Sequence, residues 1–390
     1  MRIFQPPEEK AFRQEVRDWL ETNVPRGRRP QEGGEAQRDF DVAWRRRQFD
    51  GGWGHIAWPK EYGGRGLPIT RQLVWYEECA RAGAPEHGHN VFFVALQHAG
   101  PTLIARASDE QKAHHLPLIL KGEAIWCQGF SEPGAGSDLA AIRTRGEVDG
   151  DDIVITGQKI WTSYAVHARY QELLVRTEPG SQRHRGLTFV ICDMKAPGIE
   201  VRPIRNIAGG NDFCEVFYDG ARLPLSTVVG GLGNGWDVAM SLLAFERGAA
   251  SFPVAIETAA RVEELIEYVE ETRPGRWRDT EVGARLAEAR ADAAALKAMV
   301  HLLIARGSPA GEGSHVRLFM AELTKRISAL AMDLLGPDAL DRNALGGWPR
   351  RYLEDFKTTI AAGTSQIQRN IIGERVLGLP KEGARAGGKA

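Results

Sequence analysis

The hydrophobic pattern changes its period twice along this chain, and the two changes limit the folds that the chain can adopt. Across residues 1–121 apolar side chains recur at the three- and four-residue spacing of amphipathic helices, as at Phe12 and Val16. Residues 122–230 carry short β-rich runs separated by Gly, Pro and Asp. Helix spacing returns across residues 231–390. We therefore expect an α+β multidomain protein with an N-terminal α-helical domain, a middle β domain and a C-terminal four-helix bundle, within these three ranges.

The middle domain should be a small β-barrel or sandwich. Its short runs lie close together, and no helices alternate with them as a dinucleotide-binding parallel sheet would require. The glycine-rich run 230–235 lacks the G-x-G-x-x-G spacing and has no βαβ unit around it, so we interpret it as a linker. The expected strands are 152–156, 172–175, 187–192, 199–203 and 214–218.

The C-terminal bundle follows from four long amphipathic segments joined by turns rich in Gly and Pro. Pro253 falls inside the first segment, where its missing N–H group predicts a kink. The expected helices are 236–269, 282–304, 316–335 and 348–377.

Charge and composition argue against several classes of function. The 390 residues include 50 Lys and Arg against 51 Asp and Glu, so the net charge of -1 gives no general reason to bind nucleic acid or an anionic membrane. The N-terminus lacks an apolar core of signal-peptide length and no run approaches a membrane span, which predicts a cytoplasmic location. The four cysteines are widely spaced and the ten histidines lack ligand spacing, so we expect neither a metal nor a disulfide framework.

Residues 126–163 carry the clearest indication of chemistry. The Gly/Pro/Ser/Asp cluster at 131–138 must form a loop, and its two glycines would let the backbone approach a ligand closely. A strand, a turn at Gly157 and a second strand end should follow, leading to Trp161 and two hydroxyl side chains. An indole and hydroxyls beside a glycine-lined loop suit a planar heteroaromatic ring. The alternative is an ordinary β-hairpin with a buried Trp.

The two halves of this stretch resemble the two flavin-facing motifs of the acyl-CoA dehydrogenase family. The motifs here are SEPGAGSD at 131–138 and GQKIWTS at 157–163, in the family's order. The loop WPKEYGGRGLP at 58–68 and the order of the three domains extend the resemblance over essentially the whole chain. It implies an oxidoreductase that holds FAD between the β domain and the bundle, with part of the site supplied by a neighbouring subunit. It further implies a tetramer, either of identical chains or of two different chains. An electron-transferring flavoprotein would accept the electrons.

The family's reaction needs a carboxylate. This group removes the α proton of an acyl-CoA thioester while the β carbon gives a hydride to flavin N5, which yields a trans-2-enoyl-CoA. Many members carry the glutamate just before the Gly-Thr of a C-terminal motif, where this chain has Ala362. Other members hold it on the first bundle helix immediately before an arginine, and this chain has Glu246 and Arg247 there. The resemblance thus implies Glu246 as the catalytic base and Arg247 in substrate binding. The alternative for Glu246 is a charge on a helix surface, but its small, largely apolar neighbours would make an unpaired Glu costly.

Ala362 also supports a second hypothesis, in which the chain is a base-lacking or partner-dependent subunit of a heteromeric acyl-CoA dehydrogenase. A third hypothesis, a relative with different flavin chemistry, has no residue in its favour. Straight-chain, branched, aromatic and steroid-side-chain thioesters all remain open as substrates.

The resemblance also transfers ligand contacts position by position. Ser137 matches a contact to the thioester end of the substrate. Thr364 and Gln366 match contacts near the FAD phosphate and ribose, and Gly336 matches a glycine near the FAD of the neighbouring subunit. Arg273 lies near where relatives hold the FAD pyrophosphate, although RPGRWR departs from the family's pattern. Helix caps and turns are the alternatives for these residues. The transferred contacts to the flavin ring are Gln128, which replaces an aromatic residue of some relatives, Phe130, Ser131, Trp161, Thr162 and Ser163.

Overall fold

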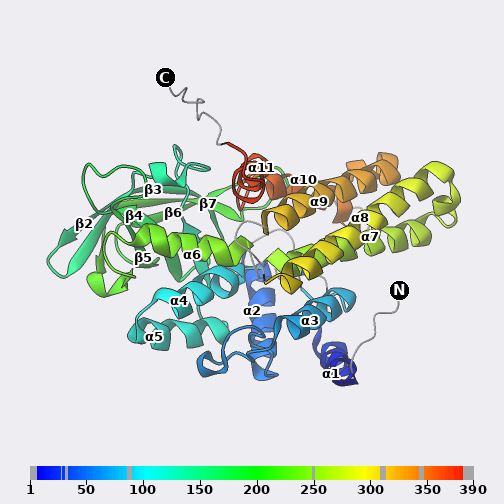
Figure 1. The fold of residues 1–390 in the computed structure, drawn as a ribbon, viewed down its shortest axis with the longest axis horizontal. Coiled ribbons are helices and arrows are strands. Elements are labelled where there is room, and N and C mark those ends of the chain that lie inside the picture. The colour runs from blue at the N-terminus through cyan, green and yellow to red at the C-terminus, as the bar shows by residue number, and fades with distance from the viewer. Residues whose placement is uncertain are drawn as a thin grey trace. The chain divides into compact units, whose positions relative to one another are not determined.

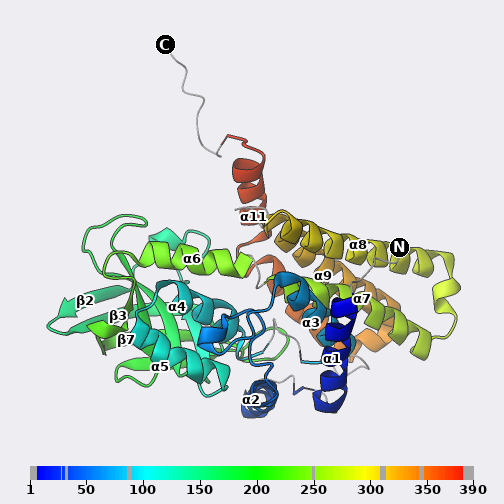
Figure 2. The same cartoon turned by 60° about the horizontal axis from the view of Figure 1, so that its bottom comes forward.

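The computed structural model of the chain describes residues 7–27, 29–30, 34–85, 90–247, 251–307, 313–341 and 347–380. Contacts between residues divide the chain into two compact units, Met1–Glu246 and Arg247–Ala390. Figures 1 and 2 show the helices and strands of both units. No helix within the described ranges is long and apolar enough to cross a membrane.

Amphipathic helices open the first unit, as the hydrophobic spacing predicts. Helix α1 buries Phe12, Val16 and Leu20 along one face, and its Trp19 joins an aromatic cluster in which the rings of Trp53 and Trp75 stack with their centroids 4.5 Å apart. Stacked and tilted aromatic pairs add to the free energy that burial of these large side chains provides. The helical segments here are α1 (Pro7–Asn23), α2 (Gly34–Asp50), α3 (Ile69–Arg81), the π-helical segment η3 (Val94–Ala99), α4 (Gly100–Arg106) and α5 (Asp109–Leu120).

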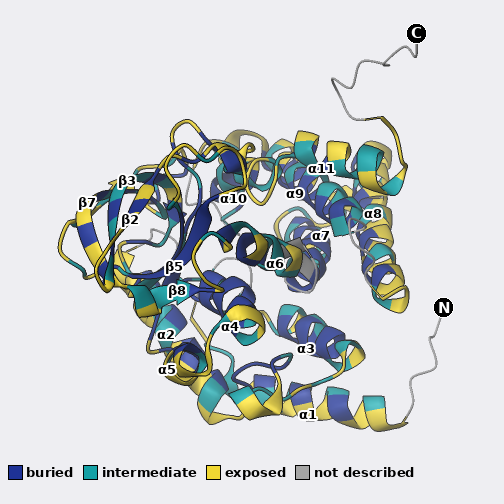
Figure 3. Cartoon of the chain, turned by 60° about the vertical axis from the view of Figure 1, so that its left-hand side comes forward, coloured by how far each residue is buried: buried dark blue, intermediate teal, exposed yellow. Residues whose placement is uncertain are grey.

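The β-rich residues of the first unit form one connected, eight-stranded sheet. Its order is β6-β7-β3-β2-β4-β5-β8, and β1 lies off this path, parallel to β4. The five expected strands are confirmed within β3 to β7. In Figure 3 the interior strand β5 is almost wholly buried, which matches its apolar sequence. The strands are β1 (Trp126–Gly129), β2 (Arg145–Asp149), β3 (Asp152–Ser163), β4 (Tyr170–Arg176), β5 (Leu187–Asp193), β6 (Ile199–Ile204), β7 (Phe213–Pro224) and β8 (Val228–Val229).

The expected turn at Gly157 is wrong, because β3 runs unbroken through it. Gly157 pairs with Tyr218 of β7. A Cβ on Gly157 would lie 2.8 Å from Thr144 Cα, and its φ is +150°. The glycine therefore permits close approach of two backbones inside a sheet, a role that sequence spacing does not distinguish from a turn.

Helix α6 (Gly235–Arg247) closes the first unit, after a glycine run that proves to be the predicted linker between β8 and this helix. Residues 248–250 lie outside the described ranges, so the expected helix 236–269 is described in two parts, α6 and, in the second unit, α7 from Ser251. Pro253 lies in the part described as α7, and the kink expected there stays a prediction.

The second unit is helical, as predicted, but its last expected helix, 348–377, is interrupted. A 3₁₀ turn at Phe356–Thr359 follows α10, and Ala362 and Gly363 both have positive φ values, +54° and +84°. Two left-handed residues in succession end any helix. The helices are α7 (Ser251–Thr272), α8 (Thr280–Ala305), α9 (Gly313–Leu335), α10 (Trp348–Asp355) and α11 (Ser365–Ile371).

Candidate functional site

A buried ion pair ties the 131–138 loop to strand β3. Lys159 Nζ lies 2.8 Å from Glu132 Oε1 and donates to the carbonyl oxygen of Phe130 at 3.0 Å. The Glu132 carboxylate also accepts the backbone N–H groups of Arg143 and Thr144, at 2.6 Å and 2.9 Å. The loop, the chain at 143–144 and the strand are therefore held by one satisfied polar network.

Both charges of this pair are largely removed from water. Burial lowers the pKa of Lys159 to about 8, although Glu132 opposes the shift. Burial acts to raise the pKa of Glu132, but the ammonium of Lys159 and the hydrogen bonds outweigh it and hold that pKa below its ordinary value. The pair is thus ionised near neutral pH, where each charge compensates the other.

Trp161 emerges from the sheet directly after this pair. The register between β3 and β7 shifts between Lys159 and Thr162, so Trp161 lies in a β-bulge, with a φ of +61°. Its indole is 58% exposed and meets Phe213 edge-on at 6.2 Å. A positive φ is unusual for a bulky residue and persists only where surrounding structure enforces it. The alternative of an ordinary β-hairpin with a buried Trp is therefore wrong. The bulge turns the indole ring of Trp161 outward.

The other expected flavin contacts from β3 fall on opposite sides of the strand. Thr162 is fully buried, whereas Ser163, the next residue after the bulge, is half-buried and lies on the opposite side of the strand. Ser163 is therefore the hydroxyl better placed to meet a ring beside the indole. Thr162 faces the protein interior.

The residues of β1 and its loop that were expected to contact a ligand also differ in how far they are buried. The ring of Phe130 is buried and meets Phe189 edge-on, so only its backbone is available to a ligand. Gln128 and Ser131 are half-buried, and Ser137 is exposed. In the loop, a Cβ added to either glycine, at 134 or 136, would meet no protein atom within 4 Å. The backbone there is open to a close ligand, as the composition predicts.

Several residues of the second unit that were expected to contact FAD lie in helix caps and turns. Thr364 caps α11 through its Oγ1, which accepts the N–H of Ile367 at 3.1 Å. The guanidinium of Arg273 donates to the carbonyl oxygens of Leu334 and Leu335, at 2.5 Å and 2.8 Å, which end helix α9. Gly336 has a φ of +60° directly after that helix, and Gln366 is exposed. Of these residues, Gln366 keeps its side chain available to a ligand.

Glu246 and Arg247 occupy the last two positions of α6. Their side chains lie outside the described residues. The structure therefore describes only the backbone of the expected base, within helix α6, and the next residues, 248–250, lie outside the described ranges.

Sequence reasoning missed the Glu132–Lys159 pair and a second buried cluster in which Glu172 contacts Gln128 and His98. The sequence does contain a signal for Lys159. Side chains alternate along a strand, so Lys159 lies on the same face as the buried Ile153 and Ile155, and this places a charged group on the inward face.

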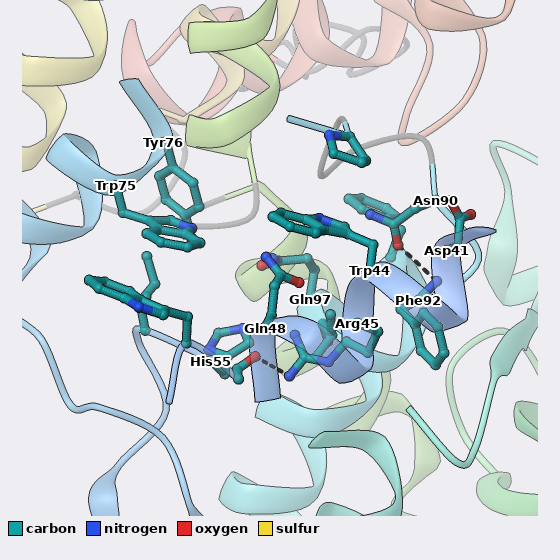
Figure 4. A pocket seen from close by; sticks show the side chains of 16 residues that line it. Asp41, Trp44, Arg45, Gln48, His55, Trp75, Tyr76, Asn90, Phe92 and Gln97 are labelled. Carbon is teal, nitrogen blue, oxygen red and sulfur yellow. Dashed lines mark hydrogen bonds between the residues drawn. The ribbon is translucent and has the colours of Figure 1, made fainter. Parts of the chain in front are cut away.

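A separate cavity of about 40 Å³ lies among the N-terminal helices (Figure 4). Its wall includes Arg45, which is buried and donates to the carbonyl oxygens of Leu120 and Gly54. Burial lowers the pKa of Arg45 to about 9. The cavity has room for roughly two or three water molecules and is lined by none of the residues predicted for the site. Within the described ranges, no group of His, Cys, Asp and Glu is placed to hold a metal ion.

Replacement of Ala362 by glycine should stabilise the protein by roughly 0.5–1 kcal/mol. The left-handed conformation costs a residue with a Cβ about 1–2 kcal/mol, and the greater freedom of glycine in the unfolded chain offsets about 0.4–1 kcal/mol of the gain. Chemical denaturation would measure the change. Gly363→Ala, at the next residue with a φ of +84°, is the matched control and should destabilise. A loss of stability in Ala362→Gly would contradict the strain argument.

Models of known families cover nearly the whole chain. The N-terminal domain of acyl-CoA dehydrogenases matches residues 6–123, the middle domain matches residues 127–221 and the C-terminal domain matches residues 233–377.

Individual relatives agree with these matches. Acyl-CoA dehydrogenase IpdE1 of Mycobacterium tuberculosis is 39% identical over 96% of this chain and 98% of its own length, and FadE26 of the same organism is 34% identical over 98% and 99%. Among solved structures, the ChsE4-ChsE5 complex of M. tuberculosis is 34% identical, with a TM-score of 0.83 over 98% of this chain and 100% of the matched chain. The Tcur3481-Tcur3483 steroid ACAD is 28% identical, with a TM-score of 0.84 over 98% and 100%. This chain, with its outward-facing indole beside a glycine-lined loop, thus belongs to the acyl-CoA dehydrogenase family of FAD-dependent oxidoreductases.

Proposed function

We propose that this protein oxidises the Cα–Cβ bond of an acyl-CoA thioester to the trans-2-enoyl-CoA, with Glu246 as the base. The observation that carries the proposal is Trp161, held in a strained, exposed conformation beside a loop that the Glu132–Lys159 pair fixes. Strain of this kind gathers at ligand sites because a functional surface requires it.

Each residue has a separate task in this reaction. Bound FAD supplies the hydride acceptor. Trp161 and Ser163 border the flavin and orient it, and the open backbone of the 131–138 loop lets the ring approach closely. Glu246 takes the α proton, which requires a carboxylate whose pKa is raised by loss of water around it. Ser137 binds the thioester end of the substrate, and Arg247 takes part in substrate binding.

The remaining contacts concern the phosphate and ribose side of FAD. Thr364, Gln366 and Gly336 serve this part of the cofactor, Thr364 through the N-terminus of α11 that it caps. The proposed contact of Arg273 with FAD has the least support, since the guanidinium already donates hydrogen bonds to carbonyl oxygens at the end of α9. The proposed domain boundaries fall at residues 121 and 230, and an electron-transferring flavoprotein is the proposed acceptor of the electrons.

The proposed substrates are bulky, polycyclic acyl-CoA thioesters. Support comes from relatives, since one similar structure is described as a steroid ACAD. One of the similar structures is described as the ChsE4-ChsE5 complex, and the name of another joins two proteins, Tcur3481-Tcur3483. Together with Ala362 in place of the base that many members carry, these names favour a second candidate function, a subunit of a heterotetramer. A homotetramer with its own base remains the first.

Anaerobic titration with a panel of short, long, branched and polycyclic acyl-CoAs tests the proposal. We expect the visible absorbance of the bound flavin to bleach with the bulky thioesters and little with short straight chains. Light scattering on the same sample gives the assembly. A yellow homotetramer that no thioester bleaches would overturn the proposal, whereas bleaching only after a partner chain is added would favour the second candidate.

A further inference from the structure

A buried polar cluster, Gln128, Glu172 and His98, lies beneath strand β1. Gln128 and Glu172 are register partners on the parallel strands β1 and β4, so their side chains leave the same face of the sheet. Gln128 Nε2 donates to Glu172 Oε1 at 2.9 Å. Nδ1 of His98, on the π-helical segment η3, lies 3.7 Å from the same oxygen. Glu172 is 0% exposed and His98 is 4% exposed.

The carboxylate fixes which end of the Gln128 amide points away from it. The NH₂ group of Gln128 faces Glu172, where the carboxylate oxygen accepts its hydrogen bond. The amide plane then directs Oε1 away from the pair. Among the described residues, no donor contacts this oxygen with a hydrogen bond. The imidazole of His98 lies beside the buried carboxylate, and its ring rests edge-on against Phe93.

Gln128 is also the least buried residue of strand β1. Its neighbours Cys127 and Gly129 are buried, whereas Gln128 is half-buried. The strand runs within two residues into the 131–138 loop. A ligand that follows this loop therefore meets a hydrogen-bond acceptor at a position where some relatives carry an aromatic ring.

We propose that Gln128 is a specificity-determining residue that accepts a hydrogen bond from a hydroxyl group on the acyl chain, and that Glu172 and His98 are its positioning residues. The inference rests on the proposed function, because it takes the ligand to be an acyl-CoA. The preferred substrates are accordingly hydroxylated acyl-CoAs rather than plain hydrocarbon chains.

Matched acyl-CoAs test the inference. Each pair has one carbon skeleton and differs by a single hydroxyl, placed at successive carbons beyond the β carbon. Calorimetry on the FAD-loaded protein, with its partner chain if one copurifies, gives the dissociation constants whether or not turnover occurs. We expect the hydroxylated member of at least one pair to bind roughly three- to tenfold tighter. Gln128→Leu should abolish the preference, so that both members of every pair bind equally.

Two further variants separate positioning from packing. Glu172→Gln should weaken the preference although Gln128 is still present, because an amide can hold either end of its neighbour. Gln158→Leu removes another cross-strand bond of the same kind, 2.9 Å from Nε2 to Glu215 Oε1, and should leave the preference unchanged.

The inference fails if the wild type binds both members of every pair equally, or if Gln128→Leu keeps the preference. It also fails if Gln128→Leu shifts the reduction potential of the ligand-free flavin, because Gln128 would then contact the cofactor. An absence of bleaching with any thioester, in contrast, would count against the proposed reaction while the binding preference is still measured.

Discussion

Replacing Glu246 with glutamine should lower kcat for acyl-CoA oxidation by about 10²–10⁴-fold, the usual contribution of a general base. The amide keeps the size of the side chain but cannot take a proton, so FAD content and substrate binding should change little. Stopped-flow bleaching of the flavin measures the step directly. Glu246→Asp is the matched control and should retain part of the rate, since the carboxylate is kept on a shorter side chain.

The family's two positions for the base allow a sharper test. Adding Ala362→Glu to the Glu246→Gln variant should restore part of the bleaching, because many members carry their glutamate at the position of Ala362. Full activity in the single Glu246→Gln variant would show that another group is the base. If the wild type is itself inactive and the Ala362→Glu change gives it flavin bleaching, the result would support the hypothesis of a partner-dependent subunit.

The second large effect concerns the buried ion pair. Lys159→Met should destabilise the protein by about 3–5 kcal/mol, because it leaves the carboxylate of Glu132 buried without its ammonium partner. FAD content should fall as well, since the same lysine holds the loop through the Phe130 carbonyl. Urea denaturation and the ratio of flavin to protein absorbance would measure the two effects.

Two controls accompany this variant. Glu132→Gln combined with Lys159→Met should be less destabilised than the sum of the single changes, as expected for a coupled pair. Lys112→Met removes a lysine whose Nζ lies 3.3 Å from an exposed carboxylate of Asp109 and should cost about 0–1 kcal/mol. Equal effects of Lys159→Met and Lys112→Met would contradict the role of the buried pair.

The order of helical and β domains could be predicted from hydrophobic period because each domain buries one continuous face. Breaks inside helical segments could not be predicted in the same way. The interruption near Ala362 depends on a left-handed alanine, which no propensity would place there.

The candidate site was predicted as a set of segments and not as individual contacts. The loop at 131–138 and Trp161 were identified by residue type. The bulge that exposes Trp161 depends on how β3 pairs with β7, so strand alternation alone could not separate Ser163 from the buried Thr162. Glu172 was missed because its partners come from β1 and η3, far away along the sequence.

The Glu132–Lys159 pair also affects how the protein opens. Its partners are separated by 27 residues, and Lys159 lies in the longest antiparallel pairing of the sheet. Most surface loops fluctuate independently of the structure that carries them. This loop cannot, because detaching it exposes a buried charge, so its anchored end belongs to the same cooperative folding unit as the sheet. The protein thereby keeps its ligand-facing loop in one conformation for as long as the sheet itself is folded.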